Sequence, residues 1–214
     1  MEIFPITFLI QTLQSIMLSF LLFSLPTISS QSATPPKIPC LTLDSSNVCG
    51  NDFVGYPVVG FPNVTVFNAA LSSAFLDTNS VANEFEHAFG CRSDQIKPVI
   101  SGFRYQLSFW CSAQVLQALK SGQCSVDASH PPKGPLLCQP ECLLATASVQ
   151  KAFEDTTACP SSASLNSNRT NLITSMSSIC SVSKTEQQAN GPHQYCFQGV
   201  PLESQSCGMF CKYL

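Results

Sequence analysis

The chain of 214 residues has a formal net charge of −3, and 44% of its residues are hydrophobic while only 11% are charged. Soluble domains usually carry about 25% charged residues, so this surface has to rely on uncharged polar side chains. A small negative net charge supplies no basic face for phosphate groups, and we therefore expect no nucleic-acid partner.

Residues 1–30 form an apolar leader. Its longest apolar run extends from Ile16 to Leu25 and is followed by small residues, the pattern of a secretory signal peptide cleaved near Ser30. The alternative is an uncleaved anchor helix over 4–25, although a spanning segment needs about 20 mostly apolar residues and this one contains Pro and Gln. Both interpretations place the rest of the chain outside the cell, and we expect it to be secreted.

An exported chain passes through the compartment in which N-glycans are added. The sequence contains the acceptor triplets Asn63-Val64-Thr65 and Asn168-Arg169-Thr170. We expect glycosylation at Asn63 and Asn168.

All 12 cysteines follow the leader, and their number is even. A chain exported through an oxidising compartment is expected to pair its thiols rather than to bind metal with them. We therefore expect no metal site, no cofactor and no free thiol for nucleophilic catalysis. The cysteines expected in disulfides are Cys40, Cys49, Cys91, Cys111, Cys124, Cys138, Cys142, Cys159, Cys180, Cys196, Cys207 and Cys211.

The part before the first helix is expected to be irregular. Residues 31–39 are rich in proline and predict an extended linker. The ordered region should begin at Cys40 and consist of loops as far as Pro62, with a short strand around 53–59.

Helical periodicity begins beyond residue 62. Phe67, Leu71 and Phe75 share one face and predict a helix over 66–76. A second apolar stripe predicts another helix that ends at Gly90, a natural C-cap.

A longer stripe predicts a single helix over 95–119. We expect Ser93 and Asp94 to cap this helix and Pro98 to lie in its first turn, where a missing N–H is tolerated. Its stop is expected at Gly122.

Cys138 and Cys142 open a further predicted helix, with both thiols on one face. The polar run 161–168 predicts a boundary, and only a short helix ending at Cys180 is expected after it. The predicted organisation is a domain over 40–159 and a small cysteine-containing extension over 160–214. The predicted class is mainly α and disulfide-rich, a helical bundle with a short β segment near the N-terminus.

Several short motifs follow one another along 40–159. They are Cys40 and Cys49, then Gly55-Tyr56-Pro57 and Phe61-Pro62-Asn63, then Cys91, Leu107-Ser-Phe-Trp-Cys111-Ser112, Cys124, and Cys138-x3-Cys142 after a proline-rich loop. In this order and spacing the chain resembles the cysteine-rich domain of the Frizzled type. The resemblance implies a fold of that kind.

The resemblance also implies a disulfide pattern. Carried over to this sequence, it pairs Cys40 with Cys124, Cys49 with Cys111 and Cys91 with Cys159. The chain departs from the family after Cys142, because sixteen residues precede the next cysteine. The partners of Cys138 and Cys142 are therefore expected among Cys159, Cys180 and Cys196, and the final pair is Cys207–Cys211 or Cys196–Cys207.

Frizzled-type domains and their relatives bind acyl chains, sterols or lipid-modified signalling proteins in a hydrophobic groove between helices. The resemblance implies a groove here between the helices at 66–76 and 95–119, with Phe67, Leu71 and Phe75 as ligand-binding residues. Without the family, the same stripe is interpreted as a core face, and Trp110 as a core residue packed on a disulfide.

The histidines His87, His130 and His193 accompany no catalytic motif, and we expect no enzymatic activity. The favoured hypothesis is a secreted, non-enzymatic binding module for an apolar ligand, lipid or lipid-modified, or for a protein partner. One alternative is an accessory ectodomain of a membrane assembly with a membrane-protein partner, such as a stretch-activated calcium-channel subunit. Another is a secreted structural or effector protein whose cysteines serve durability alone.

Overall fold

The structure is a computed structural model that describes residues 39–122, 124–126, 136–190, 196–200 and 203. All of these belong to one compact unit, Lys37–Leu214. The expected signal peptide (1–30) and nearly all of the expected linker lie outside the described residues.

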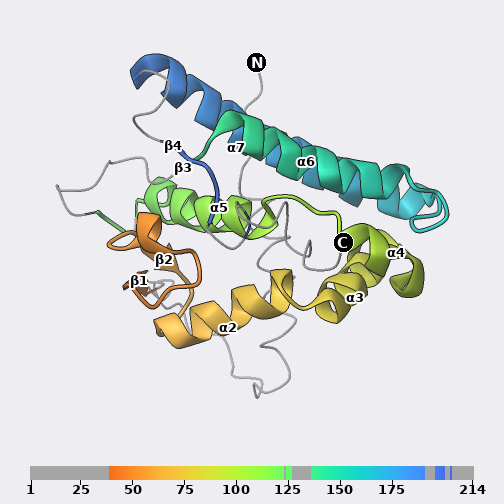
Figure 1. Ribbon diagram of the computed structural model, residues 1–214, viewed down its shortest axis with the longest axis horizontal. Coiled ribbons are helices and arrows are strands. Elements are labelled where there is room, and N and C mark those ends of the chain that lie inside the picture. Colours follow the sequence, from red (N-terminus) through yellow and green to blue (C-terminus); the bar gives the residue numbers. More distant parts are fainter. Residues whose placement is uncertain (1–38, 123, 127–135, 191–195, 201–202, 204–214) are drawn as a thin grey trace, which may run out of the picture. The chain divides into compact units, whose positions relative to one another are not determined.

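The described part is mainly helical (Figure 1). The helices are α2 (Val64–Phe75), α3 (Thr78–Phe89), α4 (Ser93–Ile100), α5 (Gln106–Lys120), α6 (Gln139–Glu154) and α7 (Ala163–Asn190). The remaining elements are the 3-10 turn η1 (Asn51–Phe53) and the strands β1 (Cys40–Thr42), β2 (Pro57–Val59), β3 (Leu136–Leu137) and β4 (Cys196–Phe197). Strands β1 and β2 pair antiparallel, and β3 and β4 pair parallel.

Helix α5 lies between α2 on one side and the α6–α7 pair on the other (Figure 1). This position explains why α5 is buried over most of its surface, including Phe109 and Ser112 at 1% exposure each. Helices α6 and α7 lie side by side, and α7 also contacts α3. The central helix therefore joins the N-terminal half of the unit to its C-terminal half.

The predicted N-terminal strand is present but shorter than expected. Phe53 belongs to η1, and β2 begins only at Pro57. Its partner β1 was not expected from the sequence. In the register, Leu41 faces Val58, which is fully buried, and Thr42 faces Pro57, which is also buried.

Helices α2 and α3 follow their sequence signals. The side chain of Asn63 accepts a hydrogen bond from the N–H of Val66 at 2.9 Å and caps α2. Asp77 caps α3 in the same way, and Gly90 ends α3 in the left-handed conformation (φ 64°). Both helices and the end of α3 at Gly90 were predicted from local signals, whereas the caps Asn63 and Asp77 were not.

The single helix predicted over 95–119 is wrong. Helix α4 ends at Ile100 and α5 begins at Gln106, because the turn between them buries Phe103 to 2% exposure. The ring of Phe103 lies 5.4 Å from that of Phe85 on α3. The backbone leaves right-handed helical geometry between the two helices, where Tyr105 has φ 52°.

The predicted start of that helix is also wrong. Arg92 is the N-cap of α4 and makes no side-chain capping bond, while Ser93 and Asp94 are its first helical residues. Pro98 lies inside α4 rather than in its first turn. The helix nevertheless forms because Ile96 and Ile100 are both fully buried, which offsets the hydrogen bond that proline cannot donate.

The C-terminal helix is longer than predicted. Helix α7 begins at Ala163, inside the polar segment 161–168 where we expected a boundary. Tertiary contacts override the low helix propensity of this segment, because α7 packs on α3 and α6. The described residues of the extension expected over 160–214 thus lie in the same compact unit as the described residues of 40–159.

Candidate functional site

The seam between α2 and α5 is the place where the resemblance implies a ligand groove. Phe67 and Leu71 lie on α2 and are both 0% exposed. The ring of Phe61 packs edge-on against Phe67 at 5.1 Å. These two predicted ligand residues are therefore core residues in this conformation and are covered from solvent.

Phe75, the third predicted ligand residue, lies at the end of α2 and is partly exposed. Its ring stacks on the indole of Trp110 from α5, with a centroid distance of 5.3 Å and an interplanar angle of 23°. Trp110 is also partly exposed, and its other neighbour is the buried ring of Phe109 at 5.6 Å. We call Phe75 and Trp110 the aromatic pair.

The aromatic pair was not predicted as a unit. Trp110 lies between the buried residues Phe109 and Cys111 and was interpreted as a core residue packed on a disulfide, whereas the structure leaves it partly exposed. A partly exposed pair of stacked rings offers flat apolar area to a ligand.

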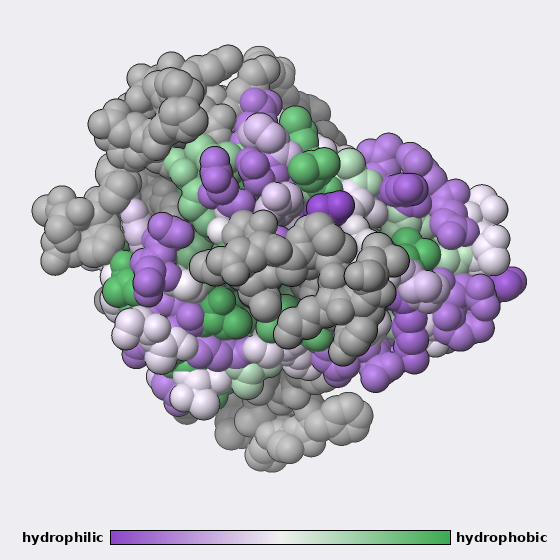
Figure 2. All heavy atoms as spheres, viewed as in Figure 1, coloured by the Kyte–Doolittle hydropathy of each residue, from purple (hydrophilic) through white to green (hydrophobic). Residues whose placement is uncertain are grey.

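Other large apolar side chains at the surface are scattered. Val66 on α2 is 44% exposed, and Leu143 and Leu144 on α6 are each 50% exposed. The face shown in Figure 2 carries its hydrophobic residues as separate small patches among hydrophilic ones, wherever the described residues are visible.

Five disulfides hold the described residues together. Three of them are the pairs that the resemblance implies: Cys40–Cys124, Cys49–Cys111 and Cys91–Cys159. The other two, Cys138–Cys196 and Cys142–Cys180, take their partners from the expected set. The alternative pair Cys196–Cys207 is wrong, because Cys196 is bonded to Cys138; Cys207 and Cys211 lie outside the described residues.

Arg169 on α7 forms a junction that the sequence did not indicate. Its side chain is 7% exposed, and it donates hydrogen bonds to the carbonyl oxygens of Phe89, Cys159 and Pro160. The disulfide between Cys91 and Cys159 lies directly beside these acceptors in the chain. One guanidinium therefore satisfies the last carbonyl of α3 and the turn before α7.

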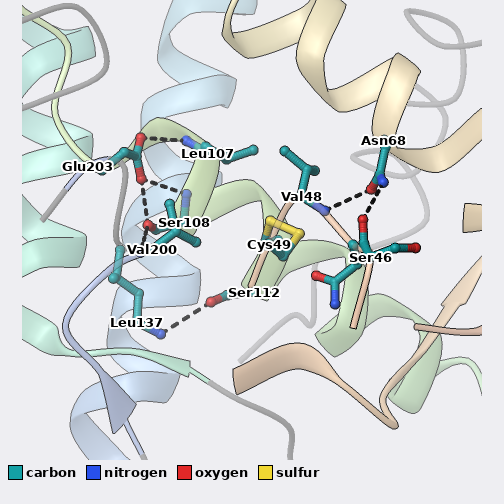
Figure 3. Close-up of a disulfide and its surroundings, with 12 residues drawn as sticks. Ser46, Val48, Cys49, Asn68, Leu107, Ser108, Ser112, Leu137, Val200 and Glu203 are labelled. Atoms are coloured by element: carbon teal, nitrogen blue, oxygen red, sulfur yellow. Dashed lines mark hydrogen bonds between the residues drawn. A yellow bond between two sulfur atoms is a disulfide. The ribbon is translucent and has the colours of Figure 1, made fainter. Parts of the chain in front are cut away.

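Glu203 is a second residue that the sequence analysis missed. Its side chain is 1% exposed and lies at the first turn of α5 (Figure 3). The carboxylate accepts hydrogen bonds from the backbone N–H groups of Leu107 and Ser108, both at 2.9 Å, and from the Ser108 hydroxyl at 2.5 Å. Burial raises the pKa of Glu203 above its usual value, while these hydrogen bonds oppose that shift.

The other predicted sites are spread over the unit. Asn63 and Asn168 are both exposed, and the side-chain amide of Asn168 donates to the carbonyl oxygen of Ala88 at 3.1 Å. His87 is exposed on α3, whereas His130 and His193 lie outside the described residues. Within the described ranges, no three His, Cys, Asp or Glu side chains are grouped as metal ligands would be. No helix among the described residues has the length and apolar character to cross a membrane.

The described unit is thus a mainly helical, disulfide-rich fold with a partly exposed aromatic pair at the α2–α5 seam. Comparisons with protein-family models, with curated proteins and with solved structures found no match.

Proposed function

We propose that the protein is a secreted, non-enzymatic binding module with a fold of the Frizzled cysteine-rich type. The proposed ligand is apolar, either a lipid or a lipid-modified protein. The observation that carries this proposal is the aromatic pair, Phe75 and Trp110, which is partly exposed at the seam where the resemblance implies a groove.

The disulfide pattern supports the same proposal. Three pairs, Cys40–Cys124, Cys49–Cys111 and Cys91–Cys159, follow the order of Frizzled-type domains. Five disulfides within one unit also suit an oxidising, extracellular environment. A scaffold held in this way loses little conformational freedom when it binds, which favours affinity.

The buried positions of Phe67 and Leu71 refine where the ligand makes contact. In the proposed complex, the apolar chain lies against Phe75 and Trp110, and Phe67 and Leu71 support the seam from below. Apolar contact area supplies most of the affinity, at about 25 cal/mol per Å² removed from water.

The test begins with protein from a secretory host, extracted and analysed by mass spectrometry for bound lipid. Titration with fatty acids and sterols follows, with Trp110 as the reporter because it is the only tryptophan in the chain. The variant Phe75→Ala is expected to weaken binding about tenfold, since it removes a large part of the apolar contact.

The matched control is Leu144→Ala, which truncates an apolar side chain on α6 that is 50% exposed. It is expected to bind like the unaltered protein. If no lipid co-purifies and neither ligand class binds, the proposal is rejected. Co-isolation with a multi-span membrane protein would then favour an accessory ectodomain, and protease resistance that is lost on reduction would favour a structural role.

A further inference from the structure

The segment Cys196–Val200 together with Glu203, which we call the strap, crosses from the start of α6 to the start of α5. At one end, β4 pairs with β3, and the N–H of Cys138 donates to the carbonyl oxygen of Phe197 at 2.9 Å. The disulfide Cys138–Cys196 fixes this end covalently. The ring of Phe197 packs edge-on against Phe53 at 5.0 Å.

At the other end, the strap supplies the cap of α5. The N-cap residue of α5 is Tyr105, which makes no side-chain capping bond. The first N–H groups of a helix have no partner within the helix. Glu203 accepts those of Leu107 and Ser108, and the hydroxyl of Ser108 accepts from the N–H of Val200 at 2.8 Å (Figure 3). The start of α5 therefore depends on residues more than 90 positions away in the chain.

Two unfavourable features accompany the closed strap, the left-handed conformation of Tyr105 and the buried carboxyl group of Glu203, and Gly199 closely approaches Tyr105. Tyr105 has φ 52°, a left-handed conformation that is disfavoured for residues other than glycine. Gly199 lies so close to Tyr105 that an added Cβ would come within 2.9 Å of its ring. Glu203 is a carboxyl group buried to 1% exposure. These costs are tolerated while a covalent bond keeps the strap in place.

That covalent bond is one of the accessible disulfides. Cys138 and Cys196 are both partly exposed. In contrast, every sulfur of Cys49–Cys111, Cys91–Cys159 and Cys142–Cys180 belongs to a residue that is at most 2% exposed. A thiol reagent from solvent therefore reaches Cys138–Cys196 before these three. Cys40–Cys124 is also accessible, but it holds β1 rather than the strap.

We propose that the strap is a redox-controlled latch on the first turn of α5. A dithiol reductant supplies two electrons and two protons to Cys138–Cys196. The S–S bond breaks, both sulfurs become thiols, and the two thiols of the reductant become a disulfide. The released strap withdraws Glu203 into water, and the first turn of α5 loses its acceptors and frays.

Opening the latch is expected to change the packing of the aromatic pair. Trp110 lies in the turn of α5 that follows Leu107 and Ser108, so fraying of the first turn changes its stacking on Phe75. An effect on ligand binding rests on the proposed function, whereas the latch itself does not.

The experiment uses the secreted, fully oxidised chain. Increasing amounts of dithiothreitol are added, free thiols are trapped with iodoacetamide, and species with one opened disulfide are separated and mapped by mass spectrometry. We expect Cys138 and Cys196 to be alkylated before the six buried cysteines. In that species, hydrogen exchange at the amides of Leu107 and Ser108 should accelerate by about tenfold or more, and Trp110 emission should change.

The species opened only at Cys40–Cys124 is the matched control, and it should keep the protection of Leu107 and Ser108. The double variant Cys138→Ser/Cys196→Ser should show fast exchange without any reductant. The latch is rejected if a buried disulfide opens first, or if Leu107 and Ser108 stay protected after Cys138–Cys196 is open. Because these readouts need no ligand, they fail or succeed independently of the lipid-binding proposal.

Discussion

The guanidinium of Arg169 donates two hydrogen bonds to the carbonyl oxygen of Phe89, from Nε at 2.9 Å and from Nη2 at 2.6 Å. Phe89 is the last residue of α3, so its carbonyl has no partner within the helix. Arg169 comes from α7, 80 residues further along the chain. This contact explains how a long polar helix is held against the first half of the unit.

The first prediction concerns this contact. Arg169→Lys should lower the free energy of unfolding by about 2–4 kcal/mol, because an ammonium cannot reach the acceptors at Phe89, Cys159 and Pro160 together. Denaturant unfolding followed by Trp110 fluorescence measures the change. Arg104→Lys is the control, since Arg104 is exposed and should tolerate the exchange. Equal stability of both variants would mean that the Arg169 contacts contribute nothing.

A second prediction concerns the C-cap of α3. Gly90 has φ 64°, and an added Cβ would lie 2.5 Å from Cδ1 of Leu165. Gly90→Ala should cost about 1–2 kcal/mol for the left-handed backbone and a further amount for moving Leu165. Gly60→Ala separates the two costs, because Gly60 has φ 87° but no atom within 4 Å of the added Cβ. Urea unfolding of both variants should show the larger loss at Gly90, and a loss at Gly60 as large as that at Gly90 would contradict the packing argument.

The buried carboxyl group gives a prediction about pH. Burial raises the pKa of Glu203 above 4.5, so the folded state favours its protonated form. The stabilisation linked to this proton is fully present below the unfolded-state pKa and is lost as the pH rises through the folded-state pKa. The unaltered protein should therefore lose stability relative to Glu203→Gln as the pH rises from the unfolded-state pKa through the raised folded-state pKa. Unfolding curves of both proteins across this range test the sign, and a difference that changes in the opposite direction would show that the hydrogen bonds hold Glu203 as an anion.

The fourth prediction separates a glycan from a helix cap. Asn63→Gln and Thr65→Ala each destroy the same acceptor triplet, and both should lose the same glycan mass by intact mass spectrometry. Only Asn63→Gln also removes the capping bond to Val66, at a cost of about 1 kcal/mol. Thermal unfolding of the enzymatically deglycosylated proteins measures this difference. A glycan-free unaltered protein would contradict the first part, and equal stability would contradict the second.

Local signals predicted part of the fold. The stripe from Phe67 to Phe75 predicted α2 and Gly90 predicted the end of α3, because periodicity and C-caps act within a few residues, while the N-cap Asn63 was not predicted. The break between α4 and α5 was missed, because the apolar stripe continues across it through Ile100, Phe103 and Leu107.

The contacts made by Arg169 and Glu203 could not be predicted from a local sequence pattern. Arg169 and Glu203 act on helix ends that are 80 to 96 residues away in the chain, so no spacing rule connects them with their acceptors. The candidate site was predicted only in its location. The sequence stripe of Phe67, Leu71 and Phe75 indicates the seam, but it does not distinguish the two covered residues from the one that reaches the surface.

The bridges Cys40–Cys124 and Cys138–Cys196 also determine how the chain responds to mechanical tension. A force applied between residues 39 and 197 passes through one bridge, along the backbone from 124 to 138, and through the other bridge. Everything enclosed by the two bridges is shielded from the load. Stretching the chain between residues 39 and 197 can then extend only the backbone from 124 to 138, by about 50 Å. This limit holds even if every helix has unfolded.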